Sequence, residues 1–390
     1  MAKAVNNSNL IFLDGLRGVA AFYVVVGHAR WLLWEGLAEF QKHPNTYSFI
    51  AKLGIYFLSL FKYGHEMVLF FFVLSGFVIH LRYAKQIASG KDNGFDFLPY
   101  TWRRFKRIYP PFLAAIILGF CLDSIGQHLH YSIYNHATPN ALINNNISID
   151  FSVNQLVGNL LFLQNTYVPD WGSNKPLWSL KFEWWFYMLY PLLYFINRKN
   201  VWLGVAIVFI FSICILSGLF ILPVKLFNEV IGALFCWWLG TLLADIYTKR
   251  VAWPIVYFSP FAILVFCIPI MQEFVPLYKD LFCALGFFGL LSFLFFLQEK
   301  GIALKWVEKL QGLGGFSYTL YVIHFPILVL MSGYLLSKKN NQMPRTQVYI
   351  FIGITICTMI AYALHFITEK WVHLKTNRES INQLDKTNIN

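Results

Sequence analysis

Two stretches of this sequence are too long, too apolar and too free of charge for the core of a soluble protein. Residues 201–224 form a run of 24 residues without Asp, Glu, Lys, Arg or His, and residues 251–272 form another of 22. About 20 apolar residues span a bilayer as a helix. Charged residues make up only 13% of the chain, against about 25% in soluble proteins. The sequence therefore predicts an all-α polytopic membrane protein and excludes a soluble enzyme, a secreted disulfide scaffold and a disordered chain.

The apolar pattern predicts about ten membrane-spanning helices in one transmembrane domain, residues 1–375. Their expected ranges are 12–34, 65–81, 108–125, 177–196, 201–221, 228–247, 253–272, 280–298, 316–336 and 346–367. Residues 49–61 are apolar but too short to span, so we expect a helix at the membrane interface. The connection 126–176 is rich in Asn, Ser, His and Asp and is expected to face solvent with little regular structure. Residues 376–390 are expected to form a polar cytoplasmic tail.

The distribution of basic residues predicts the orientation in the membrane. With the N-terminus inside, 19 Lys and Arg fall in cytoplasmic segments, 9 in outer loops and 3 within spans, out of 31. Because cytoplasmic loops are enriched in these residues, both termini are predicted to be cytoplasmic. The same enrichment accounts for the net charge of +12, so nucleic acid is not an expected partner. The six cysteines lie in apolar stretches without a C-x-x-C pair, and we expect no disulfide or metal site.

Ionisable side chains inside predicted spans are costly and therefore mark candidate functional positions. The first span carries Asp14, Arg17, His28 and Arg30. Arg17 and His28 are eleven residues apart, so a helix places them on the same face, about 16 Å apart along its axis. His28 is a candidate general base in a cleft with Arg17 near its cytoplasmic mouth. The alternative is a packing histidine bonded to a neighbouring carbonyl.

A basic cluster precedes the third predicted span. It comprises Arg103, Arg104, Lys106 and Arg107, followed by Tyr109. Arginine guanidinium groups suit bidentate contacts to phosphate, so the cluster is a candidate site for a phosphate-bearing cofactor. The alternative is anchoring to anionic lipid by positive charge at the cytoplasmic edge.

The fourth and second predicted spans carry further candidates. Ser179 and Glu183 lie one helical turn apart on one face, while Lys181 points elsewhere. Glu183 could orient a histidine, bind a hydroxyl or pair with an arginine. Ser75 and Gly76 provide small residues for the close approach of a neighbouring helix or a ligand.

The ninth predicted span contains Tyr318 and His324, followed by Pro326. His324 could line a cavity with Tyr318, or it could bond the backbone that Pro326 leaves without a partner. The residues alone leave both interpretations open.

Five motifs in order resemble those of the acyltransferase 3 membrane proteins, which include O-acetyltransferases of bacterial surface polysaccharides, peptidoglycan and nodulation factors. The motifs are Phe12-Leu13-Asp14-Gly15-Leu16-Arg17 with His28, Phe71-Phe72-Val73-Leu74-Ser75-Gly76-Phe77, Arg104-x-x-Arg107 with Tyr109-Pro110, Trp178-Ser179-Leu180 with Glu183, and Ser317-Tyr318-Thr319-Leu320-Tyr321 with His324 and Pro326. They extend from about residue 12 to residue 326.

The resemblance implies transfer of an acyl group, usually acetyl, from cytoplasmic acyl-coenzyme A to a carbohydrate hydroxyl. It implies that His28 and Arg17 are catalytic, with Glu183 as a further candidate. It implies Arg104 and Arg107 at the acyl-coenzyme A end, and Arg103, Ser75 and Gly76 are further candidates for binding this cofactor. Asp14, Ser179, Tyr318 and His324 are expected to line the substrate cavity.

The resemblance also implies a multi-pass protein of the bacterial inner membrane that modifies a lipid-linked or surface glycan such as lipopolysaccharide. Two positions depart from the family pattern: Leu69 stands where many members have an acid, and Glu369 is not followed by the usual Glu-x-Pro proline. The alternatives are transfer of another acyl group such as succinyl, a small-molecule acceptor such as a macrolide, and a transporter whose buried charges form an ion or substrate path.

Overall fold

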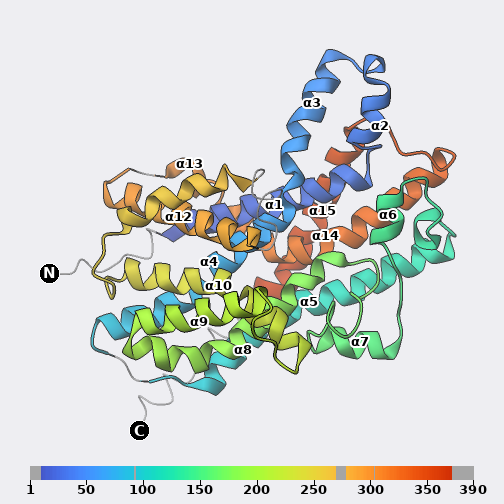
Figure 1. The fold of residues 1–390 in the computed structure, drawn as a ribbon. Helices are drawn as coiled ribbons and strands as arrows, with labels where there is room; N and C mark the ends of the chain where they lie inside the picture. Colours follow the sequence, from blue (N-terminus) through green and yellow to red (C-terminus); the bar gives the residue numbers. More distant parts are fainter. Residues whose placement is uncertain (1–9, 92–93, 269–277, 303, 371–390) are drawn as a thin grey trace, which may run out of the picture. The chain divides into compact units, whose positions relative to one another are not determined.

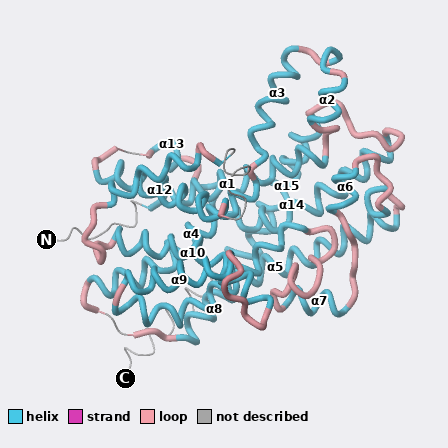
Figure 2. The backbone as a smooth tube through the Cα atoms, in the orientation of Figure 1, coloured by secondary structure: helices cyan, strands magenta, loops and turns pink. Residues whose placement is uncertain are grey.

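The computed structural model of the chain is helical throughout the part that it describes, residues 10–91, 94–268, 278–302 and 304–370. Within those residues the β-structure is limited to one isolated bridge between Gln164 and Val168, and Figure 2 shows helices joined by loops. Seven helices among these residues are long and apolar enough to cross a membrane. The prediction of an all-α polytopic membrane protein is therefore confirmed, while the number of ten spans and the orientation stay predictions.

The chain forms two compact units that alternate along the sequence. The first comprises Met1–Leu16, His65–Thr101 and Ser179–Gln311, and the second comprises Arg17–Gly64, Trp102–Trp178 and Gly312–Asn390. Most of each of these helices belongs to the first unit (Figure 1): α4 (Gly64–Ala88), α8 (Trp178–Lys199), α9 (Val201–Leu216), α10 (Lys225–Tyr247), η6 (Ile255–Val265), α12 (Lys279–Glu299) and α13 (Lys305–Glu308).

The second unit contains most or all of the residues of each remaining helix and short turn. These are α1 (Ile11–Leu32), α2 (Leu37–Lys42), η2 (Pro44–Thr46), α3 (Phe49–Ser59), η3 (Leu60–Lys62), α5 (Phe97–His128), η4 (Ser132–Asn135), α6 (Ala141–Asn146), α7 (Val153–Leu160), η5 (Lys175–Leu177), α14 (Gln311–Lys338), α15 (Val348–His365) and the π-helical turn Phe366–Lys370. Figure 1 shows α2 and α3 as the two arms of a hairpin.

Two predicted spans differ from the helices that form. The third was expected to begin near residue 108, but α5 begins at Phe97, so the basic cluster lies within the helix. The expected span 253–272 is a 3-10 helix over Ile255–Val265, and residues 269–277 lie outside the described part. Pro260 lies inside that helix, and its missing amide and fixed φ disfavour a regular α-helix there. The backbone of this segment packs against α12 at Gly289, where an added Cβ would lie 2.3 Å from the Ala262 nitrogen.

The expectation of an exposed, irregular connection at 126–176 is right only in part: many of its residues are exposed, as at 127–130 and 152–154, but residues 170–174 are buried. This segment contains α6 and α7, and its polar side chains include Gln155, Asn159, Gln164 and Asn174, all of which are buried. The segment is fastened to α5 through Asp123, which accepts hydrogen bonds from the Ser173 amide at 2.7 Å and the Ser173 hydroxyl at 2.8 Å. The amide nitrogens of these four side chains donate to backbone carbonyls, so the polar composition reports internal hydrogen bonding as well as exposure.

Candidate active site

Two histidines of the second unit, His28 on α1 and His324 on α14, face each other. His28 Nδ1 lies 2.8 Å from His324 Nε2, and the two rings are stacked with an interplanar angle of 13°. The other ring nitrogen of His324, Nδ1, lies 2.7 Å from the Tyr321 carbonyl and 3.2 Å from the Leu320 carbonyl. A carbonyl oxygen can only accept a hydrogen bond, so His324 Nδ1 carries a proton.

This arrangement defines the tautomer of both neutral rings. With its proton on Nδ1, His324 presents an unprotonated Nε2, which accepts the hydrogen bond from His28 Nδ1. The proton of His28 is then on Nδ1, and His28 Nε2 holds a lone pair. His28 is partly exposed, and among the described residues its Nε2 has no hydrogen-bond partner. The pair can therefore accept a proton at one defined atom, as a general base requires.

The backbone around His324 is stabilised by the buried connection. Pro326 has no amide, so the carbonyl of Val322 loses its helical partner. The side-chain amide of Asn174 donates to that carbonyl at 2.8 Å, and the Tyr321 hydroxyl donates to the Pro176 carbonyl at 3.2 Å. The alternative that His324 bonds the carbonyl freed by Pro326 is wrong. Asn174 bonds that carbonyl, and His324 donates to the carbonyls of Leu320 and Tyr321.

Arg17 also faces α14, on the same side of α1 as His28. Its Nε donates to the Ser317 hydroxyl at 3.1 Å and a terminal nitrogen donates to the Gly314 carbonyl at 2.7 Å. The eleven-residue spacing in the sequence thus does direct both side chains to one neighbouring helix, as expected. In this structure Arg17 joins α1 to the beginning of α14, which supports the position of the helix that carries His324.

The basic cluster occupies the third turn of α5, with all four cations partly exposed. Arg107 pairs with Glu369 at 2.7 Å and lies over the Tyr318 ring, 5.4 Å from its centroid. Glu369 is only 4% exposed, and its other oxygen accepts a hydrogen bond from the Thr319 hydroxyl at 2.6 Å. Arg107, Tyr318 and Glu369 thereby connect α5, α14 and the end of α15 into one polar cluster.

Sequence reasoning missed the role of Glu369. It was noted only as a departure from a Glu-x-Pro pattern, although a carboxylate at the end of an apolar helix is itself a signal that a cation lies nearby. Its partner Arg107 is 262 residues away in the sequence, so no local pattern could identify the pair.

The first unit contains Ser75 and Gly76 at a close crossing of α4 and α10. Ser75 Oγ accepts a hydrogen bond from Trp237 Nε1 at 3.2 Å and lies 3.1 Å from the Tyr187 hydroxyl. A Cβ on Gly76 would lie 2.0 Å from the Trp237 carbonyl oxygen. These contacts give both residues a packing role, and their assignment to cofactor binding stays a prediction.

The α8 candidates of the first unit have separate surroundings. Glu183 accepts a hydrogen bond from the Tyr187 hydroxyl, one turn along the same helix, and Ser179 is buried. Lys181, which was expected to point elsewhere, is 2% exposed and pairs with Glu229 of α10 at 2.6 Å. Asp14 is exposed in the first turn of α1.

A buried polar network in the first unit was not predicted from the sequence. His80 Nε2 lies 2.9 Å from Asp245 Oδ1, and His80 Nδ1 lies 2.7 Å from the Tyr190 hydroxyl. Arg250 donates to the same Asp245 oxygen at 2.6 Å, and Asn197 donates to the other at 3.0 Å. The network joins α4, α8 and α10, and its charges are paired as buried charges must be. Among the residues that the structure describes, no three His, Cys, Asp or Glu side chains form a metal site.

Comparison with known proteins relates these features to a family. A family model described as an acyltransferase domain matches residues 10–364. The acyltransferase MdmB of Streptomyces mycarofaciens is 30% identical over 177 residues, 44% of this chain and 38% of that protein. A protein of Rhizobium radiobacter named protein 2 in picA locus is 33% identical over 108 residues, 28% of this chain and 42% of that protein.

The matched regions thus span about two fifths of the length of these two relatives. No solved structure matches the chain significantly. The family model covers most of the chain, from the beginning of α1 almost to the end of α15. It includes the histidine pair, the basic cluster and every motif identified in the sequence. The chain therefore belongs to the acyltransferase 3 family.

Proposed function

We propose that this acyltransferase moves an acyl group, most simply acetyl, from acyl-coenzyme A to a hydroxyl of a lipid-linked or cell-surface carbohydrate. The observation that carries the proposal is the histidine pair, with His28 Nδ1 2.8 Å from His324 Nε2. It leaves one lone pair, on His28 Nε2, available to the acceptor hydroxyl. The proposed setting is a bacterial cell membrane, with ten spans and both termini cytoplasmic.

In the proposed reaction His28 Nε2 takes the proton of the acceptor hydroxyl as its oxygen attacks the thioester carbonyl. The new bond joins that oxygen to the acyl carbon, and the bond between the acyl carbon and sulfur breaks. Coenzyme A leaves as a thiolate, which takes up the proton from His28. His324 supports the step because its Nε2 accepts the hydrogen bond of the transient His28 imidazolium.

Arg103, Arg104 and Arg107 would hold the phosphates of the donor. They fit this role in type and exposure, since three guanidinium groups within two turns of α5 are partly exposed. Arg107 also pairs with Glu369, so a bound phosphate would share this arginine with a carboxylate.

Glu183, Asp14, Ser179 and Tyr318 remain candidates for contacts with the substrates. The similarity to a protein named acyltransferase MdmB supports acyl transfer. Transfer of succinyl in place of acetyl, or to a small molecule such as a macrolide, would use the same base and the same bond changes.

The test supplies acetyl- and succinyl-coenzyme A with a labelled acyl group to membranes that contain the wild-type protein, His28→Ala or Arg104→Ala/Arg107→Ala. Label in a glycan or lipid fraction with wild type only would support the proposal and identify the acceptor class. The double arginine variant is expected to raise the donor KM by more than it lowers kcat. A folded wild-type protein that transfers no label from either donor to any extract, but moves a solute across vesicles, would favour transport.

A further inference from the structure

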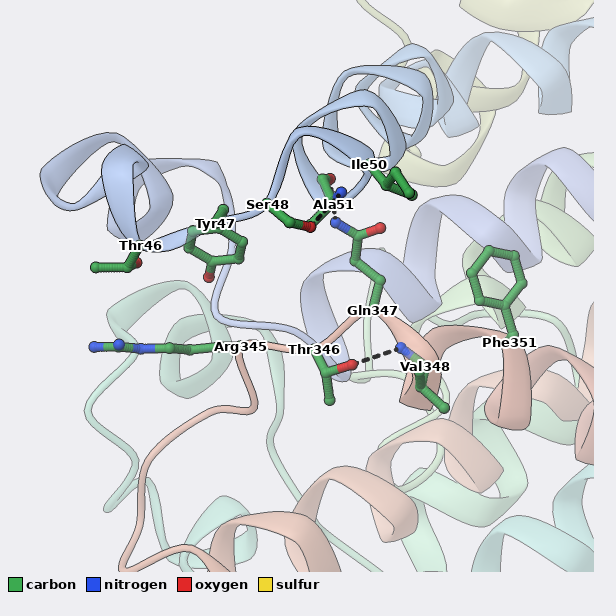
Figure 3. A pocket seen from close by; sticks show the side chains of 10 residues that line it. All are labelled: Thr46, Tyr47, Ser48, Ile50, Ala51, Arg345, Thr346, Gln347, Val348 and Phe351. Carbon is green, nitrogen blue, oxygen red and sulfur yellow. Dashed lines mark hydrogen bonds between the residues drawn. The ribbon is translucent and has the colours of Figure 1, made fainter.

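A cavity outside the histidine site lies between the α2–α3 hairpin and the beginning of α15. Its volume is about 490 Å³, and Figure 3 shows the side chains that line it. The lining is divided by chemistry. Thr46, Tyr47 and Arg345 form a polar end, and Ile50, Val348 and Phe351 form an apolar end.

At the polar end of the cavity, Arg345 lies near the Glu35 carboxylate and is bonded to Trp34 through its backbone carbonyl. Arg345 Nε lies 3.6 Å from Glu35 Oε2, and the Arg345 carbonyl accepts a hydrogen bond from Trp34 Nε1 at 3.1 Å. The side chain is 63% exposed, and among the described residues its terminal nitrogens have no hydrogen-bond partner. The planar guanidinium presents its two terminal nitrogens as a fork, the geometry that binds phosphate oxygens.

The carboxylate of Glu35 also accepts hydrogen bonds from donors other than Arg345. The carboxylate is 8% exposed and accepts hydrogen bonds from the Tyr47 hydroxyl and from His43 Nε2, the latter at 3.0 Å. Burial, followed by the hydrogen bond to Glu35, raises the pKa of Tyr47 to about 12. Tyr47 therefore stays neutral and adds no second negative charge beside Arg345.

Two helices begin at the cavity and add positive potential. Ser48 caps α3, where its hydroxyl accepts a hydrogen bond from the Ala51 amide at 3.2 Å. Thr346 Oγ1 accepts one from the Val348 amide at the first residue of α15, at 3.4 Å, and Gln347 donates to the Ala51 carbonyl at 2.8 Å. A helix N-terminus carries partial positive charge, so the arginine and both helix ends favour an anion.

The apolar end continues onto a surface that suits hydrocarbon. Ile50 is 80% exposed, and Val348 and Phe351 are each 57% exposed. Phe49, Leu53 and Phe57 extend this surface along α3, with exposures of 76%, 55% and 58%. In a membrane protein an amphipathic helix of this kind places its apolar residues in the acyl boundary of the bilayer.

We propose that this cavity binds a phosphate-bearing lipid, with the phosphate on Arg345 and the hydrocarbon chain against Ile50 and Phe351. The shared chemistry is a phosphate joined to a hydrocarbon chain, and it has two sources, an anionic phospholipid of the bilayer and an isoprenoid phosphate of the kind that carries glycans. The proposal does not depend on acyl transfer, because lipid binding is measured without a donor.

The experiment is native mass spectrometry of the purified full-length protein from micelles with equal amounts of phosphatidylglycerol and phosphatidylcholine. Wild type is expected to retain phosphatidylglycerol, and Arg345→Gln to bind it about tenfold more weakly, as for the loss of a charge-assisted hydrogen bond. Lys42→Gln is the matched control, since Lys42 is a cation of the same hairpin that pairs with Glu39 at 2.6 Å and does not line the cavity. Ile50→Ser alters an exposed position and tests the apolar end without loss of core packing.

Titration with undecaprenyl phosphate distinguishes the two sources. Displacement of phosphatidylglycerol from wild type at substoichiometric isoprenoid phosphate would support the proposal and identify the glycan-carrier class, whereas the absence of displacement would support it with bilayer phospholipid as the occupant. Equal retention of the two phospholipids by wild type would overturn the proposal. So would unchanged phosphatidylglycerol binding in both Arg345→Gln and Ile50→Ser.

Discussion

Replacement of His324 tests the most specific feature of the site, the assignment of the His28 proton to Nδ1. His324→Ala removes the acceptor 2.8 Å from His28 Nδ1. When His28 takes the hydroxyl proton it becomes an imidazolium, and the lost hydrogen bond is then one to a charged group. Such a bond contributes about 1.5–3 kcal/mol, which corresponds to a fall of about 10- to 150-fold in the rate of the chemical step.

His324→Gln is the matched variant. Its side-chain oxygen reaches roughly as far as imidazole Nε2 and can accept the same hydrogen bond, although it cannot act as a base. We expect His324→Gln to retain a rate within about tenfold of wild type. We expect His28→Ala to lose about 10²- to 10⁴-fold, as when a general base is removed.

The assay is single-turnover acyl transfer by purified protein, with folded yield and donor affinity measured for each variant. Both substitutions at His324 remove the donor to the Tyr321 carbonyl, 2.7 Å away, so they share that structural cost. A difference between Gln and Ala at equal folded yield therefore reports the acceptor to His28. A rate for His324→Gln as low as that of His324→Ala would refute this reasoning, and so would a wild-type rate in His324→Ala.

Three further substitutions test the packing around the site. Glu369→Gln removes the ion pair with the partly exposed Arg107 and is expected to cost about 1.5–3 kcal/mol of stability, measured by thermal unfolding; an unchanged Tm would show that the pair contributes nothing. Gly76→Ala should lower the folded yield strongly because its Cβ would meet a backbone oxygen at 2.0 Å, whereas Gly64→Ala, with nothing within 4 Å, should not, and equal yields would contradict the close crossing. Asn174→Ala leaves a buried carbonyl unsatisfied and should cost about 1–3 kcal/mol, so a stability change below this range would argue against that hydrogen bond.

Local features of the fold were predictable from the sequence. Apolar runs of sufficient length predicted the membrane class, and the helical repeat alone predicted that Arg17 and His28 share a face. The prediction for 253–272 failed because hydropathy does not distinguish an α-helix from the 3-10 helix that forms around Pro260. The polar composition of 126–176 predicted only part of its surroundings, because the side chains of Gln155, Asn159, Gln164 and Asn174 are buried and their amide nitrogens donate to backbone carbonyls.

The site itself depends on contacts that no local pattern contains. His28 and His324 were each identified as candidates, but their pairing joins positions 296 residues apart. The partners of Arg107 and Lys181, Glu369 and Glu229, are likewise brought together only by packing of separate helices. The sequence therefore predicted which charged residues lie within helices, while the tertiary structure determines which of them form ion pairs with one another.

The proposed role of His28, the base of an acyl transfer to a hydroxyl, is tested by a single-turnover comparison. Purified wild-type protein and His28→Ala are each mixed with labelled acetyl-coenzyme A and the acceptor fraction, and label on the acceptor is followed through a single turnover. We expect acceptor-dependent transfer by wild type and a rate at least about 10²-fold lower in the folded variant, with donor binding unchanged. Equal rates in the two proteins would contradict it.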